Sequence, residues 1–346
     1  MQSIVKGFSP CGGKHCVTTA LKQVFDFYGY SFSEEMIFGI GAGLGFVYIN
    51  LADAPIISGR IKRFEFEEKI ANRLNIKIKC KKGKQYSQVF EKTKQMIDMN
   101  KPVLIYADMP FLKYLNLEED SHFGGHAIVI FGYDEENEHF VISDRDNSDY
   151  PIRTPKGNIA EDFHLVEYSQ MEKARNSKFK PFPANNMYLE FDFAGYKPVT
   201  PEIIVEAIHE TSSSMLNPPA KLLGVKGIDK FSVEVLKWNR FETNKIRRAG
   251  IANYFMISAD GGTGGGIFRK MYGNFLVEAS RILNSEHVEK LGERYISVSE
   301  KWDQIADLLW TMSETENYEI LKSISDITKE ICINETGILK DLLAVR

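Results

Sequence analysis

Three side chains in this 346-residue chain have types that together perform nucleophilic chemistry: a cysteine, a histidine and an aspartate. Cys16 follows the helix-breaking pair Gly12-Gly13 and stands at the start of an amphipathic segment. A thiol at a helix start meets unpaired backbone N–H groups and the positive end of the helix dipole, which favour the nucleophilic thiolate. The alternative is a buried, inert cysteine, and position alone does not decide between the two.

His126 and Asp144 flank a predicted β-hairpin. Its strands, 126–133 and 139–143, are rich in β-branched and aromatic residues. A turn centred on Glu135 places His126 opposite Asp144, with Cβ atoms about 4.5–5.5 Å apart. A carboxylate at that distance fixes the tautomer of the imidazole and stabilises the imidazolium. The alternative is an ordinary strand-end histidine followed by a turn-forming aspartate.

Neighbouring residues refine this hypothesis. Gly124 and Gly125 precede His126 and let another backbone or a substrate approach closely, so Gly125 is a candidate substrate contact. His15 adjoins Cys16, but neighbours on a helix point apart, so we expect His15 to contact substrate or solvent. Cys11 is an alternative nucleophile that lies further from the helix start, where activation by the dipole is weaker.

The secondary-structure elements that position these residues are predicted from the spacing of apolar residues and from the residues that begin or end helices and strands. The apolar stripe predicts a helix over 17–28, which Gly29 ends. Further predicted elements are helical stretches at about 64–74 and 87–99 and strands at Val103–Tyr106 and Met187–Phe193.

The character of the chain changes near residue 198. Thr200 as N-cap and Pro201 at the first helical position begin a helix, and helical periodicity continues to Arg346. We therefore predict an α+β domain over residues 1–197 and an α-helical domain over 198–346. At roughly 100–200 residues per domain, two domains fit the chain length.

Composition excludes several classes of function. The net charge is −4 and the pI about 6.1, whereas nucleic-acid binding needs a concentrated basic surface. No apolar run approaches the roughly 18 residues that would span a bilayer, and the start of the chain does not read as a signal peptide. The four scattered cysteines form neither a disulfide framework nor a paired zinc motif. We expect a cytoplasmic protein with no membrane or nucleic-acid partner.

A metal site is not predicted. His122 and His126 are four residues apart, a spacing that suits a metal on a helix, but Gly124 and Gly125 between them disfavour that helix. The segment 39–45, GIGAGLG, is out of register with a dinucleotide-binding glycine motif and lacks a following GK[ST], so a nucleotide site is not predicted either.

Several segments carry a family resemblance. CVTTALKQVFDFYG (16–29), HAIVIFGYD (126–134) and VISD (141–144) resemble the papain-like cysteine peptidase superfamily. KHCVTTAL, SEEMIFGIGAGLGF (33–46) and GGGIFRKMYGNFLVEAS (264–280) resemble the butirosin biosynthesis protein H family. The resemblance implies a papain-like α+β fold followed by a helical domain that covers or flanks the cleft.

The resemblance also implies a reaction. That family moves an acyl group from an acyl carrier protein thioester to an amine. Carried over, it makes Cys16 the nucleophile, His126 the base and Asp144 the orienting acid. The implied partners are an acyl or peptidyl carrier protein and a small-molecule amine. No cofactor is needed beyond the phosphopantetheine arm that the carrier delivers.

The same interpretation extends to the glycine-rich segments. Gly41 and Gly43 could line an acyl channel beside Cys16, where missing side chains leave room for a pantetheine arm; plain loop flexibility is the alternative. The helix start after 261–266, with Arg269 in its first turn, could bind the carrier phosphate, although a glycine-rich interhelical turn is the favoured interpretation of this segment.

One departure from the superfamily pattern matters. Papain-like peptidases place a glutamine six residues before the nucleophile as an oxyanion donor, and Pro10 stands there in this chain. Ser9, Lys14 or a glycine-loop amide are candidate replacements, because losing one such donor costs about 10²–10³ in rate. A peptidase or thioesterase using the same triad, and a non-catalytic protein that binds a carrier or natural product, remain the alternatives.

Overall fold

The computed structural model describes residues 2–51 and 53–346, which divide into two compact units. The first unit comprises residues 1–34 and 75–196, and the second residues 35–74 and 197–346. An α+β unit and a mainly helical unit are therefore present, as the sequence predicts. One division between the units falls at residues 196–197, and residues 35–74 group with the C-terminal helices.

The first unit is built on an antiparallel sheet of seven described strands. Their order is β10-β7-β6-β5-β11-β4, and β1 also pairs with β6. The strands are β1 (Gln2–Ile4), β4 (Lys77–Lys82), β5 (Val103–Ala107), β6 (His126–Asp134), β7 (His139–Ser143), β10 (His164–Glu167) and β11 (Met187–Asp192). The helices are α1 (Cys16–Phe27), α4 (Tyr86–Asp98) and α5 (Tyr168–Asn176), with short 3-10 turns η1 (Met109–Phe111) and η2 (Lys113–Leu115) and a hairpin of β8 (Ile152–Thr154) and β9 (Gly157–Ile159).

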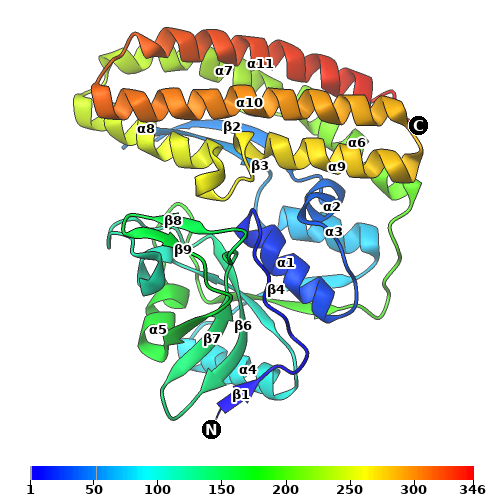
Figure 1. Cartoon of the computed structure of the whole chain (residues 1–346), viewed down its shortest axis with the longest axis vertical. Coiled ribbons are helices and arrows are strands. Elements are labelled where there is room, and N and C mark those ends of the chain that lie inside the picture. The colour runs from blue at the N-terminus through cyan, green and yellow to red at the C-terminus, as the bar shows by residue number, and fades with distance from the viewer. Residues whose placement is uncertain (1, 52) are drawn as a thin grey trace. The chain divides into compact units, whose positions relative to one another are not determined.

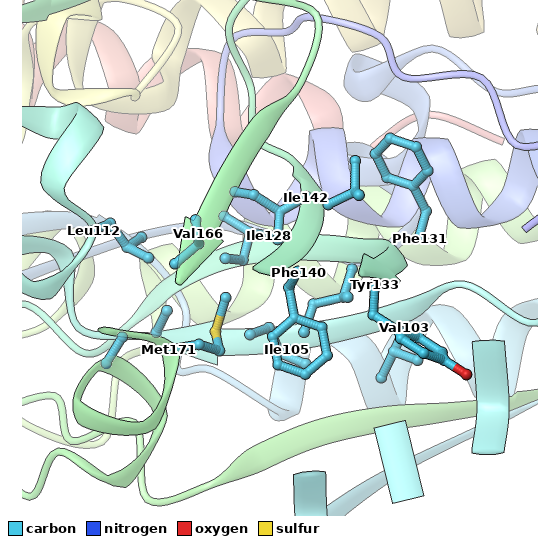
Figure 2. Packing of buried hydrophobic residues seen from close by; sticks show 14 of the residues in the cluster. Val103, Ile105, Leu112, Ile128, Phe131, Tyr133, Phe140, Ile142, Val166 and Met171 are labelled. Atoms are coloured by element: carbon cyan, nitrogen blue, oxygen red, sulfur yellow. The ribbon is translucent and has the colours of Figure 1, made fainter. Parts of the chain in front are cut away.

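Continuous apolar runs bury both faces of the central strands β5 and β6. Val103 and Ile105 on β5 and Ile128 on β6 are fully buried and pack with Phe140 of β7. Figure 2 shows Met171, which comes from α5, beside Ile105 and Phe140. The antiparallel register of β5 and β6 places His126, the first residue of β6, opposite Ala107, the last residue of β5.

The β6–β7 hairpin forms with a register that differs from the predicted one. Asp134 pairs with His139 and Val129 with Ser143, with a bulge between Ile130 and Gly132. The turn is therefore centred one to two residues after Glu135, because Glu138 adopts a left-handed conformation (φ 52°) and the loop spans four residues. The carboxylate of Asp134 accepts hydrogen bonds from the backbone of the loop and stabilises it.

The second unit combines a β-hairpin with a helical array. The hairpin strands are β2 (Leu44–Asn50) and β3 (Pro55–Arg60). The helices are α2 (Glu34–Ile40, whose first residue closes the first unit), α3 (Glu65–Leu74), α6 (Pro201–Leu216), α7 (Gly224–Glu234), α8 (Thr243–Ile257), α9 (Arg269–Leu283), α10 (Glu286–Thr315) and α11 (Ile320–Leu342), with 3-10 turns η3 (Val235–Arg240), η4 (Ala259–Gly261) and η5 (Gly266–Phe268). In Figure 1, α10 (orange) and α11 (red) run side by side.

Polar contacts explain why residues 35–74 belong to the second unit. The backbone N–H of Ile57 donates to Asn253 Oδ1 at 2.8 Å, and Asn253 Nδ2 donates to the carbonyl of Pro55 at 2.9 Å. Arg73 forms ion pairs with Glu206 and Glu210. These partners are more than 130 residues apart in the sequence, so no local pattern could reveal them.

Helix α6 begins as predicted. The Oγ1 of Thr200 accepts a hydrogen bond from the N–H of Ile203 at 3.4 Å, and Pro201 is the first helical residue. Among the described helices, none combines the length and the apolar content that crossing a bilayer requires.

Candidate active site

Cys16 is the first residue of α1. Its predecessor His15 is the N-cap, with extended backbone dihedrals, and Cys16 itself is partly exposed. The loop before the helix is held to the segment that follows β7 and contains Asp144, because the N–H of Gly13 donates to the carbonyl of Arg145 at 2.8 Å. The thiol therefore stands at the dipole-positive end of a helix, as the sequence predicts.

A buried carboxylate at the start of α1 was not predicted. Glu34 accepts hydrogen bonds from the backbone N–H groups of Lys14 (2.7 Å) and His15 (3.1 Å). It also accepts from the hydroxyls of Thr18 (2.7 Å) and Thr19 (2.8 Å). Glu34 thus accepts from the backbone N–H of the N-cap residue His15 and of its predecessor; the N-cap N–H is the donor that the glutamate of a capping box usually engages.

His126 and Asp144 meet despite the shifted register. His126 is paired with Ala107 on β5, and Asp144 follows the end of β7. The Nε2 atom of His126 lies 2.7 Å from Oδ2 of Asp144. Extending the observed register puts His126 opposite residue 146, so Asp144 is its diagonal neighbour, a relation that long side chains still span. The contact was predicted, but not the geometry that produces it.

His126 also hydrogen-bonds the side chain of Cys16. Since Nε2 is engaged by Asp144, Nδ1 is the nitrogen left for the thiol. Sulfur, imidazole and carboxylate therefore form one continuous line of contacts. His126 and Asp144 are both about 3% exposed, so this line runs inward from a partly exposed thiol to a buried carboxylate.

The electrostatics of the pair favour charge separation. Burial alone would lower the pKa of His126, but the charge and hydrogen bond of Asp144 and the contact with Cys16 raise that pKa to about 10. Burial alone would raise the pKa of Asp144, but the charge of His126 and hydrogen bonds from His126, Tyr114 and the Arg145 backbone lower it to about 2. The arrangement therefore stabilises an imidazolium beside a carboxylate.

Tyr114 is a site residue that the sequence did not reveal. Its hydroxyl donates to Oδ2 of Asp144 at 2.8 Å. Its ring stacks on His164, with centroids 3.8 Å apart and planes 9° apart. His164 Nε2 in turn lies 2.9 and 3.0 Å from the two oxygens of Asp146. Tyr114 lies in a short 3-10 turn, thirty residues before Asp144, and no motif marks it.

Three predicted substrate contacts near the triad have definite positions. Ser9 is exposed. His15 is 5% exposed, and its Nδ1 atom lies 3.3 Å from the hydroxyl of Thr18. Gly125 is buried beside the ring of Phe123. Close backbone approach, expected for the glycine pair, occurs at Gly124, where a Cβ atom would meet the backbone of 182–184 at about 2.5–3.0 Å.

The glycine segment after α2 does not leave open space. A Cβ atom at Gly41 would lie 2.2 Å from the ring of Phe66, and one at Gly43 would lie 2.7 Å from the ring of Phe38. Both glycines are buried in the second unit. Aromatic rings occupy the volume that the interpretation as an acyl channel assigns to a pantetheine arm, so these glycines serve packing.

The guanidinium of Arg269 binds protein groups in the interior and does not face a phosphate site. Its guanidinium is fully buried and contacts both oxygens of Glu335, at 2.8 and 3.1 Å. The remaining nitrogen donates to the carbonyls of Gly45 and Ile267. At the glycine turn before α9, the amide of Gly266 donates to Asp303, a carboxylate, so this turn has the structural role that was the alternative.

The other polar candidates are held by protein groups. Burial raises the pKa of the Cys11 thiol, which disfavours its thiolate, and the Cys11 carbonyl accepts from Gln23. His122 Nδ1 lies 2.9 Å from Asp108 Oδ2 and its ring stacks on Phe179. Among residues 2–51 and 53–346, no group of three or more histidine, cysteine or acidic side chains could hold a metal.

Two family profiles match the chain, and the second begins at residue 169, inside the first unit. The profile for the butirosin biosynthesis protein H N-terminal domain matches residues 15–145, a span that begins beside Cys16 and includes His126 and Asp144. The profile for a domain of unknown function (DUF4872) matches residues 169–342, half of the chain. The chain therefore belongs to the family defined by this domain of unknown function, and its first part is similar to the butirosin biosynthesis protein H N-terminal domain. A search of curated proteins finds no match to the chain.

Proposed function

We propose that this butirosin H-like protein is a cysteine-dependent acyltransferase, which moves an acyl group from a carrier-protein thioester to an amine. The observation that carries the proposal is the line of contacts from Cys16 through His126 to Asp144. This is the arrangement of a nucleophile, a base and an orienting carboxylate. The order along the chain, a helix-start cysteine followed by strand-borne histidine and aspartate, supports a papain-like relationship.

In the first step, the Cys16 thiolate attacks the carbonyl carbon of the thioester. The bond between that carbon and the carrier sulfur breaks, and His126 gives its proton to the departing thiol. The acyl group is then held on Cys16 as a new thioester. Asp144 keeps the imidazole oriented throughout, because its carboxylate engages Nε2 and leaves the other ring nitrogen to exchange the proton.

In the second step, the amine attacks the acyl-enzyme, His126 takes a proton from it, and Cys16 leaves as thiolate. The raised pKa of His126 depends in part on Cys16. Acylation removes the hydrogen-bonding and charged partner on sulfur, which lowers the pKa of His126 and favours the neutral imidazole that the second step requires. One histidine can thus act as acid in one step and as base in the next.

The oxyanion donor differs from the peptidase pattern. Pro10 occupies the position of the usual glutamine, and the backbone N–H of Lys14 donates to Glu34. That amide is therefore not the replacement. A thioester is more reactive toward thiolates than an amide is. A site that lacks the usual glutamine donor to the oxyanion therefore suits thioester exchange better than peptide hydrolysis.

The family supports a biosynthetic enzyme. Its N-terminal domain is named for butirosin biosynthesis protein H, and a role in making an antibiotic-like natural product fits amide formation. No metal or nucleotide has to supply activation, because the incoming thioester already carries it. The acyl group arrives on the phosphopantetheine arm of an acyl or peptidyl carrier protein, and the acceptor is a small-molecule amine.

The test uses a panel of acyl-pantetheine thioesters and intact mass spectrometry. We expect wild-type protein to gain one acyl mass on Cys16, and a panel of amines to discharge it as amide. Cys16→Ala should gain no acyl group, whereas Cys11→Ser should behave as wild type. Free acid formed at the same rate with or without amines identifies a hydrolase instead. Absence of any adduct on wild-type protein identifies a binding protein.

A further inference from the structure

Strand β4 and the turn after it concentrate positive charge. Residues 77–84 read KIKCKKGK, with five lysines and no acidic residue, in a chain whose net charge is −4. All five lysines are exposed. The strand ends the order of the main sheet, with β11 as its neighbour. Lysines on an edge strand commonly prevent sheets from aggregating edge to edge.

The lysines fall into two groups. Lys77 pairs with Asp192 at 3.2 Å and Lys81 with Glu190 at 3.9 Å, both across the β4–β11 ladder. Within the described part of the chain, Lys79, Lys82 and Lys84 form no ion pair. Lys79 stands opposite Glu190 in the ladder, so the five lysines share the two carboxylates of β11, and a net positive charge remains on the exposed edge.

The sheet places this edge on the same end as the triad. Lys82 pairs with Met187 and Tyr188 with Ile105, while Ala107 pairs with His126. The C-terminal end of β4 therefore lies at the sheet end that carries His126. Three strand spacings separate β4 from β6, about 14 Å at roughly 4.8 Å each. A protein docked on this edge would deliver a flexible arm over a short distance.

We propose that Lys79, Lys82 and Lys84, the edge lysines, form the docking surface for an acidic carrier protein. The inference rests on the proposed function, which requires a carrier. Charge complementarity selects the partner, because a surface with net positive charge attracts an acidic protein and speeds its association. A nucleic acid would need a wider basic surface than one strand of an acidic chain supplies.

The test measures binding of an acidic holo-acyl carrier protein by isothermal titration calorimetry. We expect the triple variant Lys79→Glu, Lys82→Glu, Lys84→Glu to bind at least about tenfold more weakly than wild type. Wild-type binding should weaken as salt rises, because surface charges are screened. The matched control reverses three lysines of the helical unit, Lys221, Lys226 and Lys230, and should bind as wild type.

Each outcome bears on one proposal. If wild type and the edge variant bind equally, the proposed docking surface is wrong. It is also wrong if the control variant loses as much affinity as the edge variant does. Binding of short DNA or of anionic vesicles through the edge lysines, without carrier binding, overturns it too. Carrier binding that depends on the edge lysines, with no acyl adduct on Cys16 from any thioester, supports docking and rejects the acyltransferase. Circular dichroism of both variants verifies folding.

Discussion

The Tyr114 hydroxyl donates to Oδ2 of Asp144, the same oxygen that His126 Nε2 contacts. The other carboxylate oxygen accepts from the backbone of Arg145 at 2.7 Å. Asp144 is therefore held by three donors in a buried setting, which keeps it ionised and fixes its plane. Burial and the neighbouring Asp144 charge raise the pKa of Tyr114 well above its usual value, so the phenol remains a donor at all working pH values.

Replacing Tyr114 by phenylalanine removes one donor from the carboxylate and keeps the ring on His164. A hydrogen bond to a charged group contributes about 1.5–3 kcal/mol, so we expect acyl transfer to slow by about tenfold or more. Without the Tyr114 hydroxyl, the Oδ2 atom of Asp144 has, among the residues that the structure describes, only His126 as a side-chain donor. It then binds the imidazolium more strongly, which raises the pKa of His126. The alkaline limb of the pH–rate profile should then move to higher pH.

Tyr133→Phe is the matched control for this variant. The hydroxyl of Tyr133 donates to Asp98 at 2.8 Å, in the same unit but away from the triad. It should leave both the rate and the pH profile unchanged. A slower Tyr114→Phe variant whose profile does not move would show that Tyr114 only packs, and that it does not tune the carboxylate.

Folding stability should report the His126–Asp144 pair through pH. The pKa of His126 rises from 6.5 to about 10 in the folded protein, so its contribution is complete below pH 6.5 and is lost as pH rises through 10. The pKa of Asp144 falls from 3.8 to about 2, so its contribution is present above pH 3.8 and is lost as pH falls through 2.

Urea unfolding at a series of pH values tests this directly. The excess stability of wild type over His126→Gln should shrink between pH 6.5 and 10. Its excess over Asp144→Asn should shrink between pH 3.8 and 2. Between pH 3.8 and 6.5 both differences should be constant. Differences that stay the same at every pH would contradict an ionised pair in the folded state.

How far the sequence predicted the site depended on the range of the contacts. Cys16 could be placed at a helix start because Gly12-Gly13 and the apolar stripe are local signals. The His126–Asp144 contact was predicted from cross-strand pairing in a β-hairpin. The predicted turn did not include the left-handed conformation of Glu138 or the bulge near Phe131. The later turn puts residue 146, rather than Asp144, opposite His126. The two side chains still meet, because Asp144 contacts His126 diagonally across the strands.

The residues that support the triad were beyond local reasoning. Glu34 lies 15–20 residues from the groups it binds and Tyr114 lies 30 from Asp144, with no periodic signal between them. The glycines at 41 and 43 looked like open space, because the sequence does not reveal that Phe66 and Phe38 fill it. The contacts of Glu34, Tyr114 and the two glycines are set by tertiary packing. Tertiary contacts also place residues 35–74 in the helical unit.

Thiol reactivity separates Cys16 from the other cysteines without any substrate. At pH 6, iodoacetamide should modify Cys16 first, because an imidazolium partner favours its thiolate. Exposed Cys80 on β4 is an internal reference for an accessible thiol outside the site. His126→Ala should slow modification of Cys16 by at least about tenfold and leave Cys80 unchanged. Peptide mass mapping over time measures both rates in one sample; faster labelling of Cys11 than Cys16 would reassign the nucleophile.

Arg269 and Glu335 form a fully buried ion pair, and Trp302 donates to the same carboxylate at 3.1 Å. Removing one partner leaves an unpaired buried charge, so Arg269→Met should destabilise the protein by about 3–5 kcal/mol. Removing both charges relieves that penalty, and Arg269→Met with Glu335→Leu should be more stable than either single variant. Chemical denaturation of the three variants tests this coupling. A phosphate-binding Arg269 would give the opposite pattern: Arg269→Met would keep wild-type stability and lose carrier affinity.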